Sequence, residues 1–158
     1  MKVFLDTNTL LDLLLDRRGC QDVAELFRLQ EEGTVQLCTS VTTMVNIAYV
    51  YNKTLGHNEL VAGLRNLADV VEVLPLDNQI LQRAVLIKGL EFEDSMQIVC
   101  ASLSSCAYLI TCTPKVYHIP RYLAHQLSLP PVLSPTAFLA RHHSENKGVL
   151  GRLLKGRK

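Results

Sequence analysis

The stretch that most constrains this chain is Lys2–Asn8, where a short apolar run ends abruptly in polar residues. Val3, Phe4 and Leu5 are too few to form a helix and are rich in strand formers. Five leucines between positions 10 and 15 then follow at a density that fits a helix, and Asp6 stands at the junction. The sequence therefore predicts a buried parallel strand that delivers Asp6 to the carboxyl end of a sheet, where open α/β sheets bind their ligands.

A carboxylate in that position has two interpretations. Burial of a charge costs free energy unless something pairs with it, and a cation is the natural partner of Asp6. Alternatively, Asp6 does no more than cap the helix that follows it. The strand position alone leaves both interpretations open.

Strand and helix patterns alternate along the rest of the chain. Strand-like runs recur at 35–39, 70–74 and 108–110, and two prolines precede a short edge-strand pattern at Val132 and Leu133. Runs with helical spacing of apolar residues lie between them. This order predicts a three-layer α/β/α fold with a parallel, Rossmann-like sheet of about five strands.

Length and composition fit one domain with a real core, since the chain has 158 residues, of which 48% are hydrophobic and 20% charged. No signal peptide precedes the first strand and no apolar run is long enough to span a bilayer, so we expect a cytoplasmic protein. The five cysteines are odd in number and show no C-x-x-C spacing, which disfavours a disulfide framework and a zinc site. We expect them to serve as small buried hydrophobes.

The charges are distributed unevenly. Six basic residues and one acidic residue lie between Arg141 and the C-terminus, although the formal net charge of the whole chain is only +1. We therefore expect a domain at 1–140 and a basic tail at 141–158. Such a tail can track a phosphate backbone or be a solvated terminus. An apolar stripe within 148–156 adds the hypothesis that this segment is helical only when docked on a surface.

Oxygen-bearing side chains gather at one expected edge of the sheet. Three strand ends supply Asp6 with Asn8, Thr39 with Ser40, and Thr111 with Thr113, and a helix start supplies Glu91, Glu93 and Asp94. Oxygen ligands suit Mg²⁺ or Mn²⁺, and such ions on carboxylates serve phosphodiester cleavage. The alternative is that the acids at the helix start only favour the positive end of a helix dipole.

Asn46 also has two interpretations, because it lies on a helix face that is otherwise nearly all apolar. It is either a satisfied core amide or a side chain that reaches the site and holds water or a ligand. Other chemistries are disfavoured by missing motifs. The chain has no phosphate-binding loop and no G-x-S-x-G elbow. An aspartyl phosphatase of the haloacid-dehalogenase type would need a second Asp at the position of Asn8.

At four places the sequence resembles the PIN domain family: Leu5–Asp12, Phe92–Gln97, Leu109–Thr111 and Leu133–Leu139. These segments follow one another with the family's order and spacing. The resemblance implies a Rossmann-like sheet, an acidic site that depends on Mg²⁺ or Mn²⁺, and cleavage of single-stranded RNA or tRNA. Many bacterial members resemble VapC toxins and form dimers, so an antitoxin protein and a second copy of the chain are implied partners.

The sequence departs from the family pattern at several acidic positions. Asn46 stands where the family commonly has Glu, and Val116 stands where an acid is expected. Thr113 replaces an Asn or Asp, and Glu91 replaces the first Asp of the acidic helix start. A site with fewer carboxylates should bind its metal more weakly. The acids that remain at matching positions are Asp6 and Asp94.

Two functions are therefore open. The first is a metal-dependent endoribonuclease of PIN type, such as the toxin of a toxin–antitoxin pair, in which Asp6 and Asp94 are the metal ligands and Glu91 assists catalysis. Its binding residues would be Asn8, Asn46, Glu93, Thr111 and Thr113. The second is a catalytically inactive PIN-like module that binds RNA or a protein partner, which the replacements at 46 and 116 favour.

Overall fold

The computed structural model describes residues 1–54 and 57–144. Its strands are β1 (Lys2–Leu5), β2 (Gln36–Ser40), β3 (Glu72–Leu74), β4 (Tyr108–Ile110) and β5 (Val132–Leu133). Its helices are α1 (Thr7–Leu14), α2 (Cys20–Glu31), α3 (Val41–Thr54), α4 (His57–Val70), α5 (Asn78–Ala84), α6 (Phe92–Leu103) and α7 (Arg121–Gln126), with a 3-10 turn η1 at Pro114–Val116. A last helix runs over 135–144.

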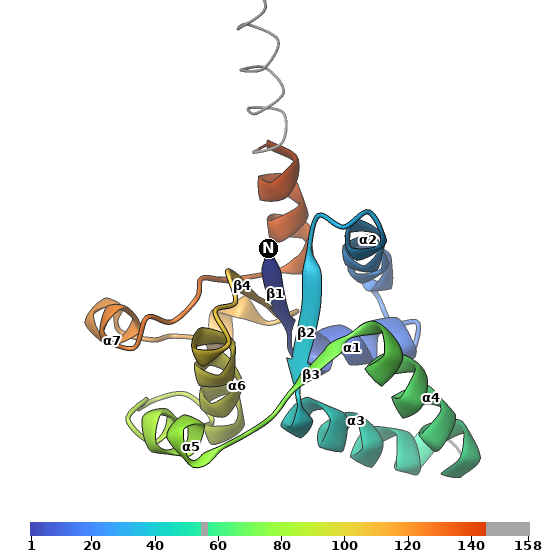
Figure 1. Cartoon of the computed structure of the whole chain (residues 1–158), viewed down its shortest axis with the longest axis horizontal. Coiled ribbons are helices and arrows are strands. Elements are labelled where there is room, and N and C mark those ends of the chain that lie inside the picture. Colours follow the sequence, from blue (N-terminus) through green and yellow to red (C-terminus); the bar gives the residue numbers. More distant parts are fainter. Residues whose placement is uncertain (55–56, 145–158) are drawn as a thin grey trace, which may run out of the picture.

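The five strands form one sheet in the order β3-β2-β1-β4-β5, and every neighbouring pair is parallel. The predicted parallel sheet is thereby confirmed, with β1 at its centre (Figure 1). Phe4 of β1 lies opposite Cys38 of β2 on one side and Leu109 of β4 on the other. The carboxyl ends of these three strands therefore meet at one edge of the sheet.

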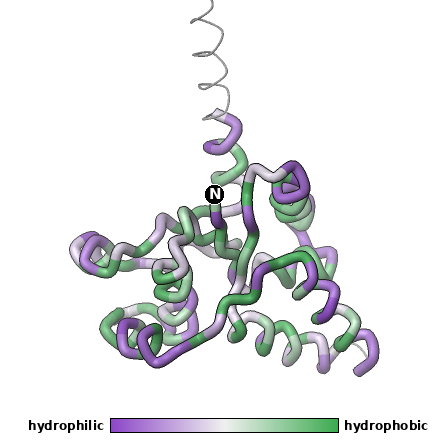
Figure 2. The backbone as a smooth tube through the Cα atoms, in the orientation of Figure 1, coloured by the Kyte–Doolittle hydropathy of each residue, from purple (hydrophilic) through white to green (hydrophobic). Residues whose placement is uncertain are grey.

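Two hydrophobic cores cover the two faces of the sheet, as the three-layer prediction requires. Val3 and Leu5 face a core built with α1, α2, α3, α4 and the last helix. Phe4 faces the other core, built with α5, α6 and α7. Figure 1 shows these two groups of helices on opposite sides of the strands, and Figure 2 shows hydrophobic and hydrophilic turns alternating along the helices. Alternate residues of β1 point to opposite faces because the side-chain period of a strand is two.

The main difference from the predicted elements lies between β4 and β5. This segment contains Pro114 and Pro120, yet α7 follows Pro120 directly. Proline is tolerated at the start of a helix, where its missing N–H would have no partner. The last helix also continues beyond residue 140, and His142 is buried against the ring of Phe138 with centroids 5.8 Å apart. The division of the chain at residue 140 stays a prediction, and residues 145–158 lie outside the described residues.

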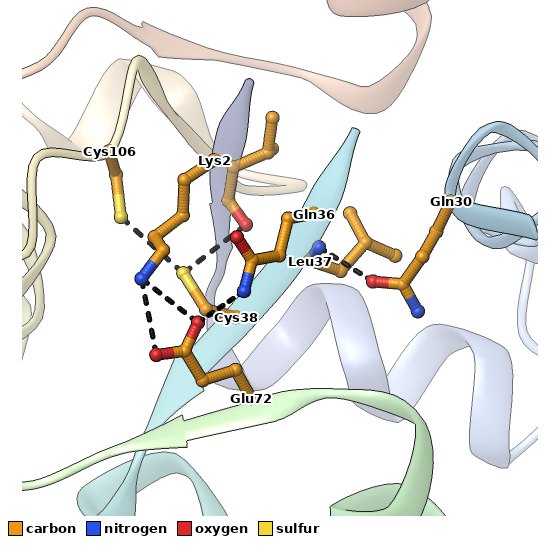
Figure 3. A network of polar contacts seen from close by, with 8 residues as sticks. Lys2, Gln30, Gln36, Leu37, Cys38, Glu72 and Cys106 are labelled. Atoms are coloured by element: carbon orange, nitrogen blue, oxygen red, sulfur yellow. Dashed lines mark hydrogen bonds and ion pairs between the residues drawn. The ribbon is translucent and has the colours of Figure 1, made fainter. Parts of the chain in front are cut away.

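A polar network joins the amino-terminal halves of the three strands β1, β2 and β3 (Figure 3). Lys2 forms an ion pair with Glu72 at 2.9 Å, and Gln36 donates to the same carboxylate at 2.8 Å. The Sγ atoms of Cys38 and Cys106 lie 3.4 Å apart, and the five cysteines are free thiols. This network lies at the start of the strands, away from the edge that carries Asp6. In the part of the chain that the structure describes, no helix is long and apolar enough to cross a membrane.

Candidate active site

Asp6 lies directly after β1 and is the N-cap of α1. Its Oδ1 accepts a hydrogen bond from the backbone N–H of Thr9 at 2.8 Å, and only 3% of the residue is exposed. Burial raises the pKa of this carboxyl, hydrogen bonds from Thr111 and Thr9 partly offset the rise, and the charge of Asp94 adds to it. Asp6 therefore does cap the helix, but the cap leaves a buried carboxylate that a nearby positive charge would stabilise.

Asp94 lies in the first turn of α6, whose N-cap is Glu91. The hydroxyl of Tyr117 donates to its Oδ1 at 3.2 Å. Burial raises the pKa of the Asp94 carboxyl, the hydrogen bond from Tyr117 lowers it, and the charge of Glu91 raises it. Both aspartates are thus held in surroundings that disfavour their negative charge.

The two aspartates line one cleft of about 320 Å³ at the carboxyl edge of the sheet. Glu91 and Glu93 come to this cleft from the start of α6, and Asn8 comes from the first turn of α1. The cleft thus brings together six of the residues expected from the sequence. The full lining is Asp6, Thr7, Asn8, Leu11, Asn46, Tyr49, Val50, Glu91, Glu93, Asp94 and Gln97.

Glu93 is held by side chains from three helices. Its Oε1 accepts hydrogen bonds from Nδ2 of Asn46, from Nε2 of Gln97 at 3.0 Å and from Oγ1 of Thr7 at 3.4 Å. Asn46 is therefore a partner of a site residue rather than a satisfied core amide. The Oε1 atom of Gln97 is buried without a hydrogen-bond partner among the described residues, although Gln97 lines the cleft.

The remaining expected residues lie outside the cleft lining. Thr111 is fully buried behind Asp6, and its Oγ1 accepts the backbone N–H of Thr113 at 3.1 Å. Thr39 donates to the carbonyl oxygen of Leu5 at 2.8 Å, so its hydroxyl serves the backbone. Ser40 accepts the backbone N–H of Thr43 at 3.3 Å and caps α3. These hydroxyl groups support the strand ends that carry the site.

The donor set fits a divalent cation that is held by few protein ligands. Within the described ranges, neither Asp6 nor Asp94 forms an ion pair with a basic side chain. The buried carboxylate of Asp6 and the half-buried carboxylate of Asp94, which line one cleft without a basic partner, are a pair of hard oxygen ligands. In the same ranges, no three His, Cys, Asp or Glu side chains converge closely enough to hold a metal ion. Water would have to complete the coordination of any ion bound here.

Sequence reasoning missed several residues of this site, among them Thr7, which donates to Glu93. Gln97 follows Glu93 by four positions, so helical spacing alone places the two on one face of α6. Tyr49 follows Asn46 by three positions on α3 in the same way. The position of Tyr117 carried no such signal, since its contact with Asp94 depends on how η1 packs against α6.

The comparison with known families decides the classification. The sequence profile of the PIN domain matches residues 2–112, which include the first four strands and the whole acidic edge. The chain belongs to the PIN domain family. No curated protein matches the sequence significantly.

Solved structures share the fold of this PIN domain. One is VapBC2 from Rickettsia felis bound to a promoter DNA fragment, with a TM-score of 0.65, 14% identity, and coverage of 85% of this chain and 98% of that one. Another is DNA-bound VapBC from Salmonella typhimurium, with a TM-score of 0.62, 19% identity, and coverage of 85% and 98%. A third is a toxin–antitoxin complex from Klebsiella pneumoniae, with a TM-score of 0.61, 20% identity, and coverage of 84% and 97%.

Proposed function

We propose that this PIN domain is a metal-dependent endoribonuclease with weak activity, and that it is the toxin of a toxin–antitoxin pair in the cytoplasm. The observation that carries the proposal is the pair of carboxylates of Asp6 and Asp94. Asp6 is buried and Asp94 is half-buried, both line one cleft at the carboxyl edge of the sheet, and the described residues offer neither of them a cationic partner. That arrangement is costly for a protein that binds no cation there.

Asp6 and Asp94 would hold Mg²⁺ or Mn²⁺, which when bound supplies a polarised water and stabilises negative charge on a phosphate. Each aspartate has its Oδ1 fixed by a hydrogen bond, from Thr9 and from Tyr117. The second oxygen of Asp94 would then be left to face an ion. Glu91 adds negative charge beside Asp94 and would assist by accepting a proton from water. Asn8 and Asn46 would orient water or phosphate, and Thr111 with Thr113 would steady Asp6 from behind.

The activity should be weak because the site has few carboxylates. Metal affinity rises with the number of charged ligands, and the carboxylate of Glu93, which also lines the cleft, is already engaged by three donors. We therefore expect cleavage to need divalent ion at millimolar concentration.

The proposed partners of this chain are an antitoxin protein, RNA and a second copy of the chain. The similar structures are complexes of toxins with antitoxins, so we infer an antitoxin protein as a partner of this chain. The proposed substrate is single-stranded RNA or tRNA. A homodimer is part of the proposal, in line with bacterial PIN toxins.

The second candidate function is a catalytically inactive PIN module that binds RNA or a protein. It is favoured by the hydrogen bond from Asn46 to Glu93, which occupies both side chains with one another. In that case the cleft would be a binding surface without a bound ion.

Titration with Mn²⁺, followed by an assay on single-stranded RNA, separates the two functions. The wild type should bind Mn²⁺ and cleave RNA, and Asp6→Asn and Asp94→Asn should each abolish cleavage and weaken Mn²⁺ binding. Asp69→Asn is the matched control, because Asp69 is exposed on α4 away from the cleft. Cleavage that persists undiminished in both site variants would reveal a contaminating nuclease. A wild type that binds RNA or an antitoxin without binding Mn²⁺ would establish the inactive module.

A further inference from the structure

The hydroxyl of Tyr117, in the segment that follows β4, contacts Asp94, which lines the acidic cleft. It donates a hydrogen bond to Oδ1 of Asp94 at 3.2 Å. We propose that Tyr117 is a positioning residue of this site, which holds the Asp94 carboxylate in the orientation that binds a divalent cation. This inference rests on the proposed function, and it concerns a residue outside the set expected from the sequence.

The backbone around Tyr117 fixes where its ring lies. The N–H of Tyr117 donates to the carbonyl oxygen of Pro114 at 3.2 Å, and its own carbonyl oxygen accepts the N–H of Ile119 at 3.1 Å. The ring packs against the core between the sheet and α6. Because the ring is packed and the backbone is bonded on both sides, the hydroxyl is directed at Asp94 without further ordering of a mobile side chain.

The contact between Tyr117 and Asp94 has the chemistry expected of a residue that orients a metal ligand by hydrogen bonding to it. The phenol hydroxyl is the donor of this contact, and a carboxylate oxygen of Asp94 is the acceptor. The hydrogen bond occupies one oxygen of Asp94 and leaves the other without a hydrogen-bond partner among the described residues. Carboxylates that bind metals are commonly hydrogen-bonded in this way, and the partners orient them.

The neighbouring residue shows that this segment contributes Tyr117 and not an acid. Val116 is 44% exposed and is absent from the cleft lining. Its side chain therefore lies outside the site, although the family pattern places an acid at this position. One residue later the segment supplies a neutral donor to Asp94, which does line the cleft, and this donor orders a carboxylate that is already there.

The test is the Mn²⁺ affinity of the full chain, measured by electron paramagnetic resonance with Mn²⁺ alone. Tyr117→Phe keeps the ring and removes only the hydroxyl. It should weaken Mn²⁺ binding by about tenfold or more, the usual effect of losing a partner of a metal ligand, while the melting temperature changes little. Tyr122→Phe is the matched control, because Tyr122 is 73% exposed on α7, and its affinity should equal that of the wild type.

A cycle with Asp94→Asn shows whether Tyr117 acts through Asp94. Adding Tyr117→Phe to Asp94→Asn should cause no further loss of the residual affinity. If Tyr117→Phe weakened Mn²⁺ binding equally in the wild type and in Asp94→Asn, the hydroxyl would not act through Asp94. That result would overturn the inference. If the wild type binds Mn²⁺ and Tyr117→Phe binds it with the same affinity, the inference about Tyr117 is overturned and the proposed function is not. A wild type that binds no Mn²⁺ at millimolar concentration would end the proposed nuclease function and this inference with it.

Discussion

Asn46 on α3 donates a hydrogen bond from its Nδ2 to Oε1 of Glu93 on α6, and the contact joins the two helices across the acidic cleft. Gln97 and Thr7 donate to the same oxygen. The family pattern has an acid at the position of Asn46 on α3. In this chain α3 supplies a hydrogen-bond donor there, and the carboxylate that it meets is that of Glu93 on α6. The amide of Asn46 is uncharged and neutralises no charge. Its N–H does, however, satisfy one oxygen of the Glu93 carboxylate.

Replacing Asn46 by Glu restores the family's acid but removes this donor. Two carboxylates would then face one another, and like charges at short range disfavour ionisation of both. We expect Asn46→Glu to lower the free energy of unfolding by about 0.5–1.5 kcal/mol without metal, because Glu93 also loses one of its three hydrogen-bond donors. Millimolar Mn²⁺ should recover most of that loss. Thermal melting with and without Mn²⁺ measures both effects.

Asn52→Glu is the control for this change, since Asn52 lies on the same helix and is exposed. It should leave the melting temperature and its response to Mn²⁺ nearly unchanged. An Asn46→Glu protein that melts like the wild type in the absence of metal would show that the contact with Glu93 contributes little.

Replacing Asp6 by Asn should stabilise the metal-free protein at neutral pH. The folded state raises the pKa of Asp6 above its ordinary 3.8, so the folded state binds the proton more tightly than the unfolded chain. The free energy of unfolding therefore falls as the pH rises from about 3.8 through the raised pKa. Asn can still cap α1, because its side-chain oxygen accepts the same hydrogen bond.

The measurement is urea denaturation of wild type and Asp6→Asn across the pH range. The variant should be the more stable protein at pH 7, and the two curves should converge at low pH, where the wild-type carboxyl is protonated in both states. Asp69→Asn, at an exposed site, should show no such pH-dependent gain. A constant difference between the curves at all pH values would contradict the assigned cause.

Phe138 tests whether the last helix belongs to the domain. The residue is 1% exposed, and its ring lies 5.4 Å from that of Tyr108 on β4. Phe138→Ala should reduce the free energy of unfolding by about 3–5 kcal/mol, as is usual for deleting a buried phenyl ring. Phe92→Ala, at a residue that is 50% exposed, should cost far less. Similar midpoints of urea denaturation for the two variants would argue against the packing of this helix.

Removal of residues 145–158 tests the basic tail. This segment contains five basic residues and one acidic residue. Ending the chain after Ser144 keeps the buried His142 and should leave the melting temperature nearly unchanged. RNA affinity should fall, and its dependence on salt should become shallower because fewer counterions are released. If the shortened chain binds RNA with the same affinity and the same salt dependence, the tail is merely a terminus.

Local sequence determined most of the fold because most strands and helices carry their own apolar period, and α1, α3 and α5 each begin at a capping side chain. The junction at Asp6 shows this well, since an apolar run, a capping carboxylate and a leucine-rich helix follow one another within a few residues. The parallel orientation of the strands followed from the alternation of strands and helices. The helix α7 was missed because its six residues lie between prolines and carry too little periodicity to be recognised.

The sequence also determined which carboxylates are available to the site, because Asp6 ends a strand and Asp94 begins a helix, and both positions open on the same edge of a parallel sheet. Only the tertiary structure decided what those carboxylates meet. The contact of Asn46 with Glu93 spans 47 positions and that of Tyr117 with Asp94 spans 23. Neither separation corresponds to the repeat of a helix or a strand, so no sequence pattern could reveal these contacts. Such contacts depend on how whole elements pack, and packing is a property of the assembled core rather than of any local segment.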